Sequence, residues 1–231
     1  MKQKSILFIK LIMCLAVYLG LSGQVSAGVL ENAQKGLPDA QYELGNEYYF
    51  GRDAEQDYEA AAYWYLKAAE QGHIGSQCQL GMMHLYGYLD GANDNMAAKW
   101  FFNAAEQGDA ESQYQLGKMY LRGQIVEKGD QTAAKWITDA ARQGHTAAQV
   151  LLGDMYCDGW GVKQSYEEAK HWYLEAANQG ASQAYGRLAE LYYNGKGVEQ
   201  STEKGDCWRQ KSEGQDQSLS HLMYQSVKSQ T

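Results

Sequence analysis

Residues 147–180 read AAQVLLGDMYCDGWGVKQSYEEAKHWYLEAANQG, and this stretch contains the pattern that decides the fold. Its tryptophan, Trp172, is one of five that stand 36 residues apart, and a leucine, a small residue and two glycines recur at the same interval. Such register over five copies indicates tandem repeats of one structural unit. The columns are Trp64, Trp100, Trp136, Trp172 and Trp208; Leu44, Leu80, Leu116, Leu152 and Leu188; Gly45, Gly81, Gly117, Gly153 and Ala189; Gly51, Gly87, Gly123, Gly159 and Gly195; and Gly36, Gly72, Gly108, Gly144 and Gly180.

Each unit is predicted to fold as a helical hairpin. In the first copy, apolar and small residues at helical spacing predict a first helix over about residues 40–50, which ends at Gly51. A second helix is predicted over about residues 58–71, after an N-cap column of Asp57, Asn93, Gly129, Ser165 and Ser201. We call these helix A and helix B.

Small residues are expected to bring the two helices of each hairpin close together. The column of Ala61, Ala97, Ala133 and Ala169 on helix B is expected to face the small residues of helix A, and the tryptophans to fill the adjoining space. One hairpin of this size cannot bury its apolar face alone, so the copies must stack on their neighbours. The predicted fold class is therefore all-α, a solenoid of five 36-residue hairpins.

The two ends of the chain depart from the repeat. Leu30 and Ala33 match the end of a helix B, and Leu219, Leu222 and Val227 follow helical spacing after the last copy. The predicted organisation is a signal peptide over 1–27, an N-terminal half-hairpin over 28–36, repeats over 37–72, 73–108, 109–144, 145–180 and 181–216, and a C-terminal capping helix and tail over 217–231.

The N-terminal segment has the layout of a cleaved secretory signal. Lys2 and Lys4 precede an apolar stretch over 6–21, and Val25-Ser26-Ala27 forms a small-x-small site. The alternative is a retained anchor, but Lys10 leaves only 11–21 free of charge, and a span needs about 20 apolar residues. We therefore expect cleavage after Ala27, no stable membrane insertion afterwards, and a periplasmic or secreted protein.

The charge of the chain bounds its partners. The formal net charge is −8; segment 1–27 holds three lysines and no acids, so the rest keeps 17 basic and 28 acidic residues, a charge of −11. An excess of acid argues against nucleic acid and anionic membranes as partners and is compatible with a basic protein.

The stretches AAQVLLGDMYCDGWGV and SYEEAKHWYLEAANQG, with their copies, resemble the Sel1-like repeat family, a relative of tetratricopeptide repeats. The resemblance covers about residues 30–216. It implies a right-handed superhelix of antiparallel hairpins with a concave face, and a role as an adaptor or scaffold. The family's glycine-valine pair is present at Gly161-Val162 and Gly197-Val198 but absent from the first three repeats, whose A–B loops are therefore expected to bend differently.

In such solenoids helix A lines the concave surface, and the resemblance therefore places three unburied columns of helix A on a protein-binding face. These columns vary between copies and include aromatic, methionine and arginine side chains, which are enriched at interfaces. The alternative is a solvated face that is free to drift. The columns are Glu43, Gln79, Gln115, Leu151 and Arg187; Asn46, Met82, Lys118, Asp154 and Glu190; and Phe50, Tyr86, Arg122, Asp158 and Asn194.

No motif in the sequence indicates catalysis, a metal or a cofactor. The histidines lack metal-ligand spacing, and no nucleophile elbow or phosphate loop occurs. Cys78, Cys157 and Cys207 are not expected to form disulfides, since repeats separate them, although Cys157 with Cys207 is the least unfavourable pair. The sequence thus favours a monomeric, non-catalytic scaffold that binds a protein, of which an immunity or inhibitor protein against a secreted toxin is one form; the alternative is an envelope hydrolase or a binder of peptidoglycan or a small ligand.

Overall fold

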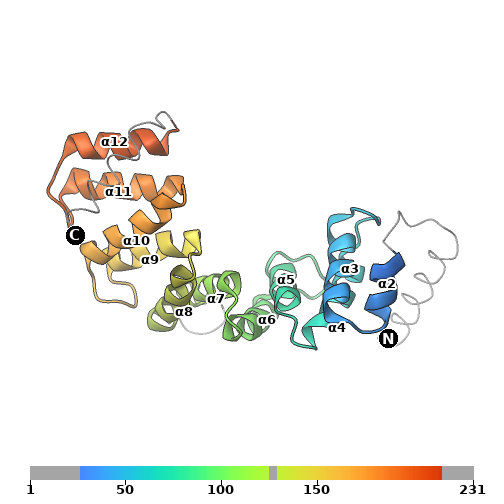
Figure 1. Ribbon diagram of the computed structural model, residues 1–231. Coiled ribbons are helices and arrows are strands. Elements are labelled where there is room, and N and C mark those ends of the chain that lie inside the picture. Colours follow the sequence, from blue (N-terminus) through green and yellow to red (C-terminus); the bar gives the residue numbers. More distant parts are fainter. Residues whose placement is uncertain (1–26, 125–128, 215–231) are drawn as a thin grey trace. The chain divides into compact units, whose positions relative to one another are not determined.

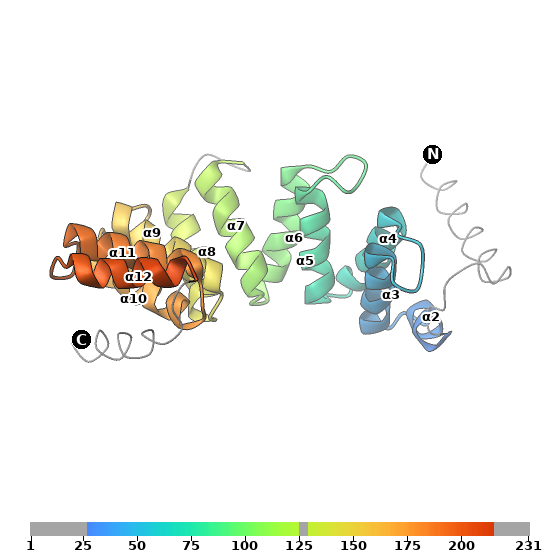
Figure 2. The same ribbon diagram turned by 90° about the horizontal axis from the view of Figure 1, so that it is seen from above.

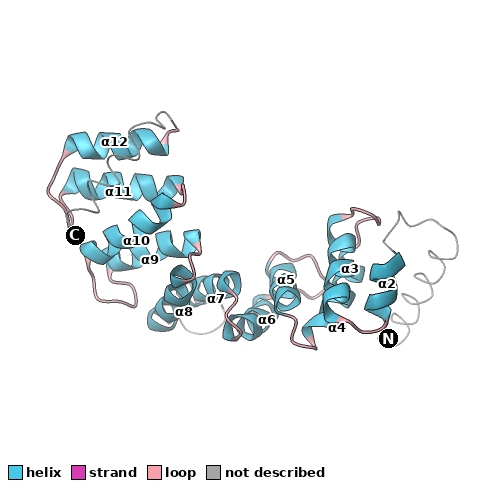
Figure 3. Cartoon of the chain, in the orientation of Figure 1, coloured by secondary structure: helices cyan, strands magenta, loops and turns pink. Residues whose placement is uncertain are grey.

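The computed structural model describes residues 27–124 and 129–214, and neither stretch contains a strand (Figures 1 and 3). The predicted signal peptide, apart from Ala27, and the predicted capping helix lie outside the described residues. The helices are α2 (Ala27–Gln34), α3 (Pro38–Phe50), α4 (Tyr58–Ala69), α5 (Ile74–Leu85), α6 (Asp94–Glu106), α7 (Ala110–Arg122), α8 (Asp130–Arg142), α9 (Thr146–Asp158), α10 (Tyr166–Asn178), α11 (Ser182–Asn194) and α12 (Thr202–Ser212).

The helices belong to two compact units, of which unit 1 ends at Asp109 and unit 2 begins at Ala110. In unit 1, α3 packs with α4 and α5 with α6 as hairpins, α2 packs on α3, and α4 packs on α5. In unit 2, the hairpins are α7–α8, α9–α10 and α11–α12, and each stacks on the next through α8 with α9 and α10 with α11 (Figure 2). The all-α hairpin architecture predicted from the 36-residue period is confirmed.

The helix ends follow the predicted capping chemistry. The side chains of Asp57, Asn93, Ser165 and Ser201 each accept a hydrogen bond from a backbone N–H in the first turn of their helix. Gly129, which has no side chain, makes no such bond. Helix A of the first copy ends at Gly51, whose φ of 63° is left-handed, but it begins at Pro38, two residues earlier than predicted.

In each of the first four hairpins, a large side chain of helix B lies on a glycine of helix A. A Cβ placed on Gly81 would stand 2.6 Å from the Phe101 ring. The expectation that the alanine column faces these glycines is incomplete, because the alanines are buried but the atoms nearest to the glycines belong to the residue after each tryptophan. The pairs are Gly45 with Tyr65, Gly81 with Phe101, Gly117 with Ile137, and Gly153 with Tyr173.

The tryptophan column does not have one environment. Trp64, Trp136 and Trp208 are buried, whereas Trp100 and Trp172 are partly exposed. The residue that follows the tryptophan is buried in each of the first four copies, because its side chain lies on the glycine of helix A.

A glutamine clamp, absent from our predictions, joins successive repeats. In the second copy, Gln77 is buried; its Nε2 donates to the Ala69 carbonyl of the preceding repeat (3.2 Å), and its Oε1 accepts from Gln107 Nε2 (2.7 Å). These two hydrogen bonds offset the desolvation free energy of the buried amide, because both its nitrogen and its oxygen have a partner. Equivalent glutamine pairs are Gln41 with Gln71, Gln113 with Gln143, and Gln149 with Gln179.

Two histidines cap helix A of the second and fourth copies. His73 Nδ1 accepts the backbone N–H of Ser76 (3.1 Å), the ring lies 4.7 Å from that of Tyr42, and Nε2 lies 3.5 Å from an Asp39 oxygen. His145 repeats the cap at the start of α9, where Nδ1 accepts the Ala148 N–H. Because Nδ1 must be unprotonated to accept a hydrogen bond, the cap at His73 requires the neutral ring.

We expect acidification to destabilise unit 1 through His73 and His84, which both lie in that unit. Burial lowers the pKa of His73, against an opposing effect of Asp39, and burial also lowers that of His84. The unfolded chain then takes up protons at a higher pH than the folded chain. The stability is therefore present at neutral pH and is lost as the pH falls below the ordinary histidine value of 6.5.

Denaturant titrations between about pH 7.5 and 5.5 will measure this dependence. His73→Asn keeps a capping side chain but cannot titrate, and His84→Tyr restores the residue of its column. The other four copies carry a tyrosine at the position of His84, namely Tyr48, Tyr120, Tyr156 and Tyr192. The double variant should lose less stability on acidification than the wild type. An undiminished loss in the double variant would contradict the assignment.

Candidate functional site on helix A

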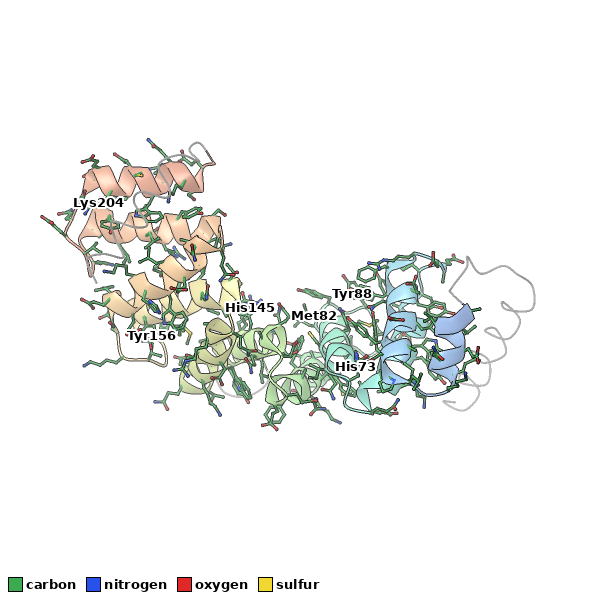
Figure 4. All side chains as sticks on the ribbon, viewed as in Figure 1. His73, Met82, Tyr88, His145, Tyr156 and Lys204 are labelled. Atoms are coloured by element: carbon green, nitrogen blue, oxygen red, sulfur yellow. The ribbon has the colours of Figure 1, made fainter. Side chains whose placement is uncertain are left out.

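The three predicted columns lie on the first helix of each hairpin, and most of their side chains reach solvent. In unit 1, Glu43, Phe50 and Tyr86 are exposed, and Asn46, Gln79 and Met82 are partly buried; Figure 4 labels Met82. In unit 2, the exposed members are Arg122, Asp158, Arg187, Glu190 and Asn194, and the partly buried ones are Lys118, Leu151 and Asp154.

Gln115 departs from the expected exposure. It is only 5% exposed, because its amide donates to Glu111 and its carbonyl accepts from Lys118 Nζ (3.2 Å). Both ends of this side chain are therefore already engaged, and it offers little to a partner.

In unit 2, five of the predicted residues surround one pocket of about 210 Å³. Helix α9 supplies Asp154 and Asp158, and α11 supplies Arg187, Glu190 and Asn194. The pocket is completed by five residues that lie outside the predicted columns, namely Cys157, Trp160, Tyr173, Leu191 and Lys196. The 36-residue stacking brings α9 and α11 together, so columns that are remote in sequence share one cavity.

Asp154 is the polar centre of this pocket. Its Oδ1 accepts from Tyr173 Oη (2.7 Å) and from Arg187 Nε (2.8 Å), and its Oδ2 lies 3.4 Å from Arg187 Nη2. The two-oxygen contact fixes the plane of the guanidinium. Arg187 also reaches Glu190 (3.5 Å), so the charged groups are held in place before any ligand arrives.

The ionisable groups at the floor of the pocket favour their neutral forms. Burial, together with hydrogen bonds to Cys157 and Asp154, raises the pKa of Tyr173. Burial raises the pKa of the Cys157 thiol, against the opposing effect of the hydrogen bond from Tyr173. A thiol with a raised pKa is a poor nucleophile at neutral pH. The phenol and the thiol therefore line the pocket as neutral hydrogen-bonding groups.

Unit 1 carries a different surface, which lies at the ends of its helices A and in the adjoining segments. Phe50, Tyr86 and Tyr88 are 50%, 58% and 39% exposed. The ring of Tyr49 contacts that of Phe50, and the ring of Tyr58 contacts that of Tyr88. We call these five residues the aromatic patch. Our columns contained only Phe50 and Tyr86, because the other three lie on loop or helix positions that the 36-residue pattern does not distinguish.

Within residues 27–124 and 129–214, no cluster of three His, Cys, Asp or Glu side chains is placed to hold a metal ion. Cys78, Cys157 and Cys207 are present as thiols. Of the helices that the structure describes, none is both long enough and apolar enough to cross a membrane.

Stacked helical hairpins of equal length, with constant packing positions and a variable first-helix face, define a tandem-repeat protein of the solenoid class. The Sel1 repeat family matches residues 38–73, 74–109, 110–145, 146–180 and 182–205. The chain therefore belongs to the Sel1 repeat family, whose members are generally protein-interaction scaffolds.

Solved structures with the same fold include proteins from three bacteria. A protective antigen of uropathogenic Escherichia coli, c5321, is 33% identical with a TM-score of 0.79, and the match covers 81% of this chain and 40% of that chain. A Sel1 repeat protein from Oxalobacter formigenes is 29% identical with a TM-score of 0.78, over 89% of this chain and 85% of that chain.

A more distant likeness is to the immunity protein Pa5087 from Pseudomonas aeruginosa, at 20% identity and a TM-score of 0.51, over 89% of this chain and 74% of that chain. At that identity the likeness shows the fold alone. No curated protein is significantly similar to this chain. The chain spans less than half the length of the E. coli antigen.

Proposed function

We propose that this protein is a non-catalytic scaffold that binds another protein through the helix-A face. The observation that carries the proposal is the pocket of unit 2, where five variable helix-A residues meet around the Asp154–Arg187 pair. The leucine and alanine columns between the helices are constant and buried, whereas these side chains differ from copy to copy. Fixed charged groups beside an exposed indole, Trp160, suit the recognition of a protein surface.

The proposal places the protein in the periplasm or outside the cell. It rests on the signal-like segment 1–27 and the small-x-small site that ends at Ala27. Blocking signal processing should leave a precursor that is larger by the mass of this segment.

An immunity or inhibitor role is one form of the same function. The net charge supports a basic partner, and a protein with the same fold, Pa5087, is an immunity protein. The alternative function is an envelope hydrolase or a binder of peptidoglycan or a small ligand. Burial raises the pKa of the Cys157 thiol, which disfavours a thiolate nucleophile in this pocket. Turnover of a cell-wall substrate that one pocket substitution abolishes would favour the enzyme.

Site-specific photo-crosslinking tests the proposed face. A benzoylphenylalanine in place of Tyr86 or Asp158 should give an adduct of defined mass in cells that export the protein. The same residue in place of Lys99 or Lys135, which are exposed on α6 and α8, should give none. Equal adducts from both faces, or adducts from helix B alone, would refute the helix-A assignment.

A further inference from the structure

The aromatic patch of unit 1 is open to solvent although its rings are large and apolar. Phe50 ends α3, Tyr86 caps α5, and Tyr88 lies in the loop that follows. Figure 4 labels Tyr88 and His73, which lie at opposite ends of α5, so the patch and the histidine cap are separate features. Exposed aromatic rings that gather on one surface mark an interaction site more often than a solvated face.

Contacts between the rings hold the patch in one arrangement. Tyr58 stacks on Tyr88 with ring centroids 4.7 Å apart and an angle of 15° between the planes. Tyr49 meets Phe50 edge-on at 5.0 Å and contacts Tyr58 at 5.4 Å. A partner would therefore meet ring faces that are already positioned, which lowers the entropic cost of binding.

Carboxylates neighbour the patch residues along the chain, with Asp53 in the α3–α4 loop, Glu59 after Tyr58 on α4, and Asp90 in the α5–α6 loop. A Glu59 oxygen accepts the backbone N–H of Asp90 (3.4 Å), and a Glu47 oxygen accepts that of Asp53 (3.3 Å). Asp53, Glu59 and Asp90 are exposed. Ring faces beside carboxylates favour a cation, because the quadrupole of the ring and the full negative charge attract it together.

The acidic charge of the protein is concentrated in this unit. Residues 28–109 contain 13 acidic and 4 basic residues, a formal charge of −9, whereas residues 110–231 contain 15 acidic and 13 basic residues, a charge of −2. A positively charged partner is therefore drawn to unit 1 and not to the chain as a whole.

One contact beside the patch shows that a guanidinium fits on one of its rings. The Arg52 Cζ lies 4.7 Å from the centroid of the Phe50 ring, so a guanidinium already occupies one ring face. A planar guanidinium stacks on an aromatic ring and pairs with a carboxylate in the same pose, which a lysine ammonium does less well.

We propose that the aromatic patch, with its border of Asp53, Glu59 and Asp90, binds arginine side chains of a cationic protein segment. The inference rests on the proposed function, because it names the chemical class of the partner on the helix-A face. An uncharged occupant such as a polyproline segment or a glycan would stack on the same rings but would gain nothing from the carboxylates.

Calorimetric titration of the full chain with nona-arginine, nona-lysine and decaproline tests the proposal. We expect nona-arginine to bind most tightly, and we expect its affinity to fall as salt is added. Joint replacement of Phe50, Tyr86 and Tyr88 by alanine should weaken it roughly tenfold or more, and Glu59→Gln with Asp90→Asn several-fold. Tyr86→Ala alone, at the most exposed ring, provides a variant with little effect on folding.

Matched controls separate the patch from general charge and general aromatic content. Glu70→Gln with Glu106→Gln removes the same charge from exposed positions at the C-terminal ends of α4 and α6. Trp160→Ala removes an exposed ring from unit 2. Both should bind nona-arginine within about twofold of the wild type. Equal losses in these controls, equal affinity for the lysine peptide, or tighter binding of decaproline would overturn the inference.

The outcome is distinguishable from failure of the proposed function. If crosslinking from Tyr86 and Asp158 captures a partner while the triple alanine variant still binds nona-arginine normally, only the arginine inference fails. If nona-arginine binds at the patch but neither helix-A position yields an adduct, the scaffold function fails and the arginine site stands.

Discussion

Replacing Phe101 with alanine is expected to lower the free energy of unfolding by about 3–5 kcal/mol, the usual cost of deleting a buried phenylalanine side chain. The Phe101 side chain is fully buried, and it lies on Gly81 between α5 and α6. The cavity would open between these two helices, and α5 is also packed on α4. Urea unfolding followed by far-ultraviolet circular dichroism measures the loss.

A double-mutant cycle tests whether ring and glycine form one contact. Gly81→Ala should cost about 1–3 kcal/mol in the wild type, since its Cβ would overlap the ring, and much less in the Phe101→Ala background. Gly186→Ala is the matched control, because its Cβ would meet only the Ser212 hydroxyl at 3.8 Å. There the gain in helix propensity should make the change neutral or stabilising. Additive losses at Gly81 and Phe101 would exclude the proposed packing.

The repeat and its hairpins could be predicted from sequence because they depend on period and on local chemistry. Glycine after a helix, and Asp, Asn or Ser before one, act through the backbone within a single turn. The partner of Gly81 could not be predicted in this way. Neighbouring helix positions differ by about 100° in direction, so spacing alone did not decide whether the tryptophan or the residue after it lies on the glycine.

The candidate site was predictable only as a set of helix faces. The columns on helix A contain Asp154 and Arg187, but nothing in their spacing showed that the two side chains pair across successive repeats. The remaining pocket residues come from other elements: Tyr173 from helix B, and Trp160 and Lys196 from the A–B loops. Loop side chains take positions that the 36-residue pattern does not specify.

The glutamine clamp shows a signal that was present but not used. Gln41, Gln77, Gln113 and Gln149 stand 36 apart, as the tryptophans do, yet a polar residue on a helix is usually taken as exposed. Their regularity could have indicated a buried amide with a backbone partner, because a solvated column has no reason to repeat one residue type. In the fifth copy Tyr185 takes over, and its hydroxyl donates to the Ala177 carbonyl (3.1 Å).

Trp208→Ala should destabilise unit 2 by about 3–5 kcal/mol, whereas Trp172→Ala, in the same sequence column, should cost clearly less. Trp208 is 1% exposed, and its ring stacks on that of Tyr185 with the centroids 6.0 Å apart. Lys211 Nζ lies 4.1 Å from the centroid of the Trp208 ring. Trp172, in contrast, is partly exposed. The expected difference comes from the buried area and from the cavity that each deletion leaves.

Urea unfolding of the two variants side by side provides the measurement, with Trp136→Ala, which is buried in the same unit, as the third member of the series. If the losses follow burial, Trp136 and Trp208 will group together and Trp172 will stand apart. If all three losses are equal, the column acts as a unit and the packing described for its members is incorrect. The series therefore separates what the 36-residue period specifies, a tryptophan at each hairpin, from what only the three-dimensional neighbours determine, namely how much stability each tryptophan contributes.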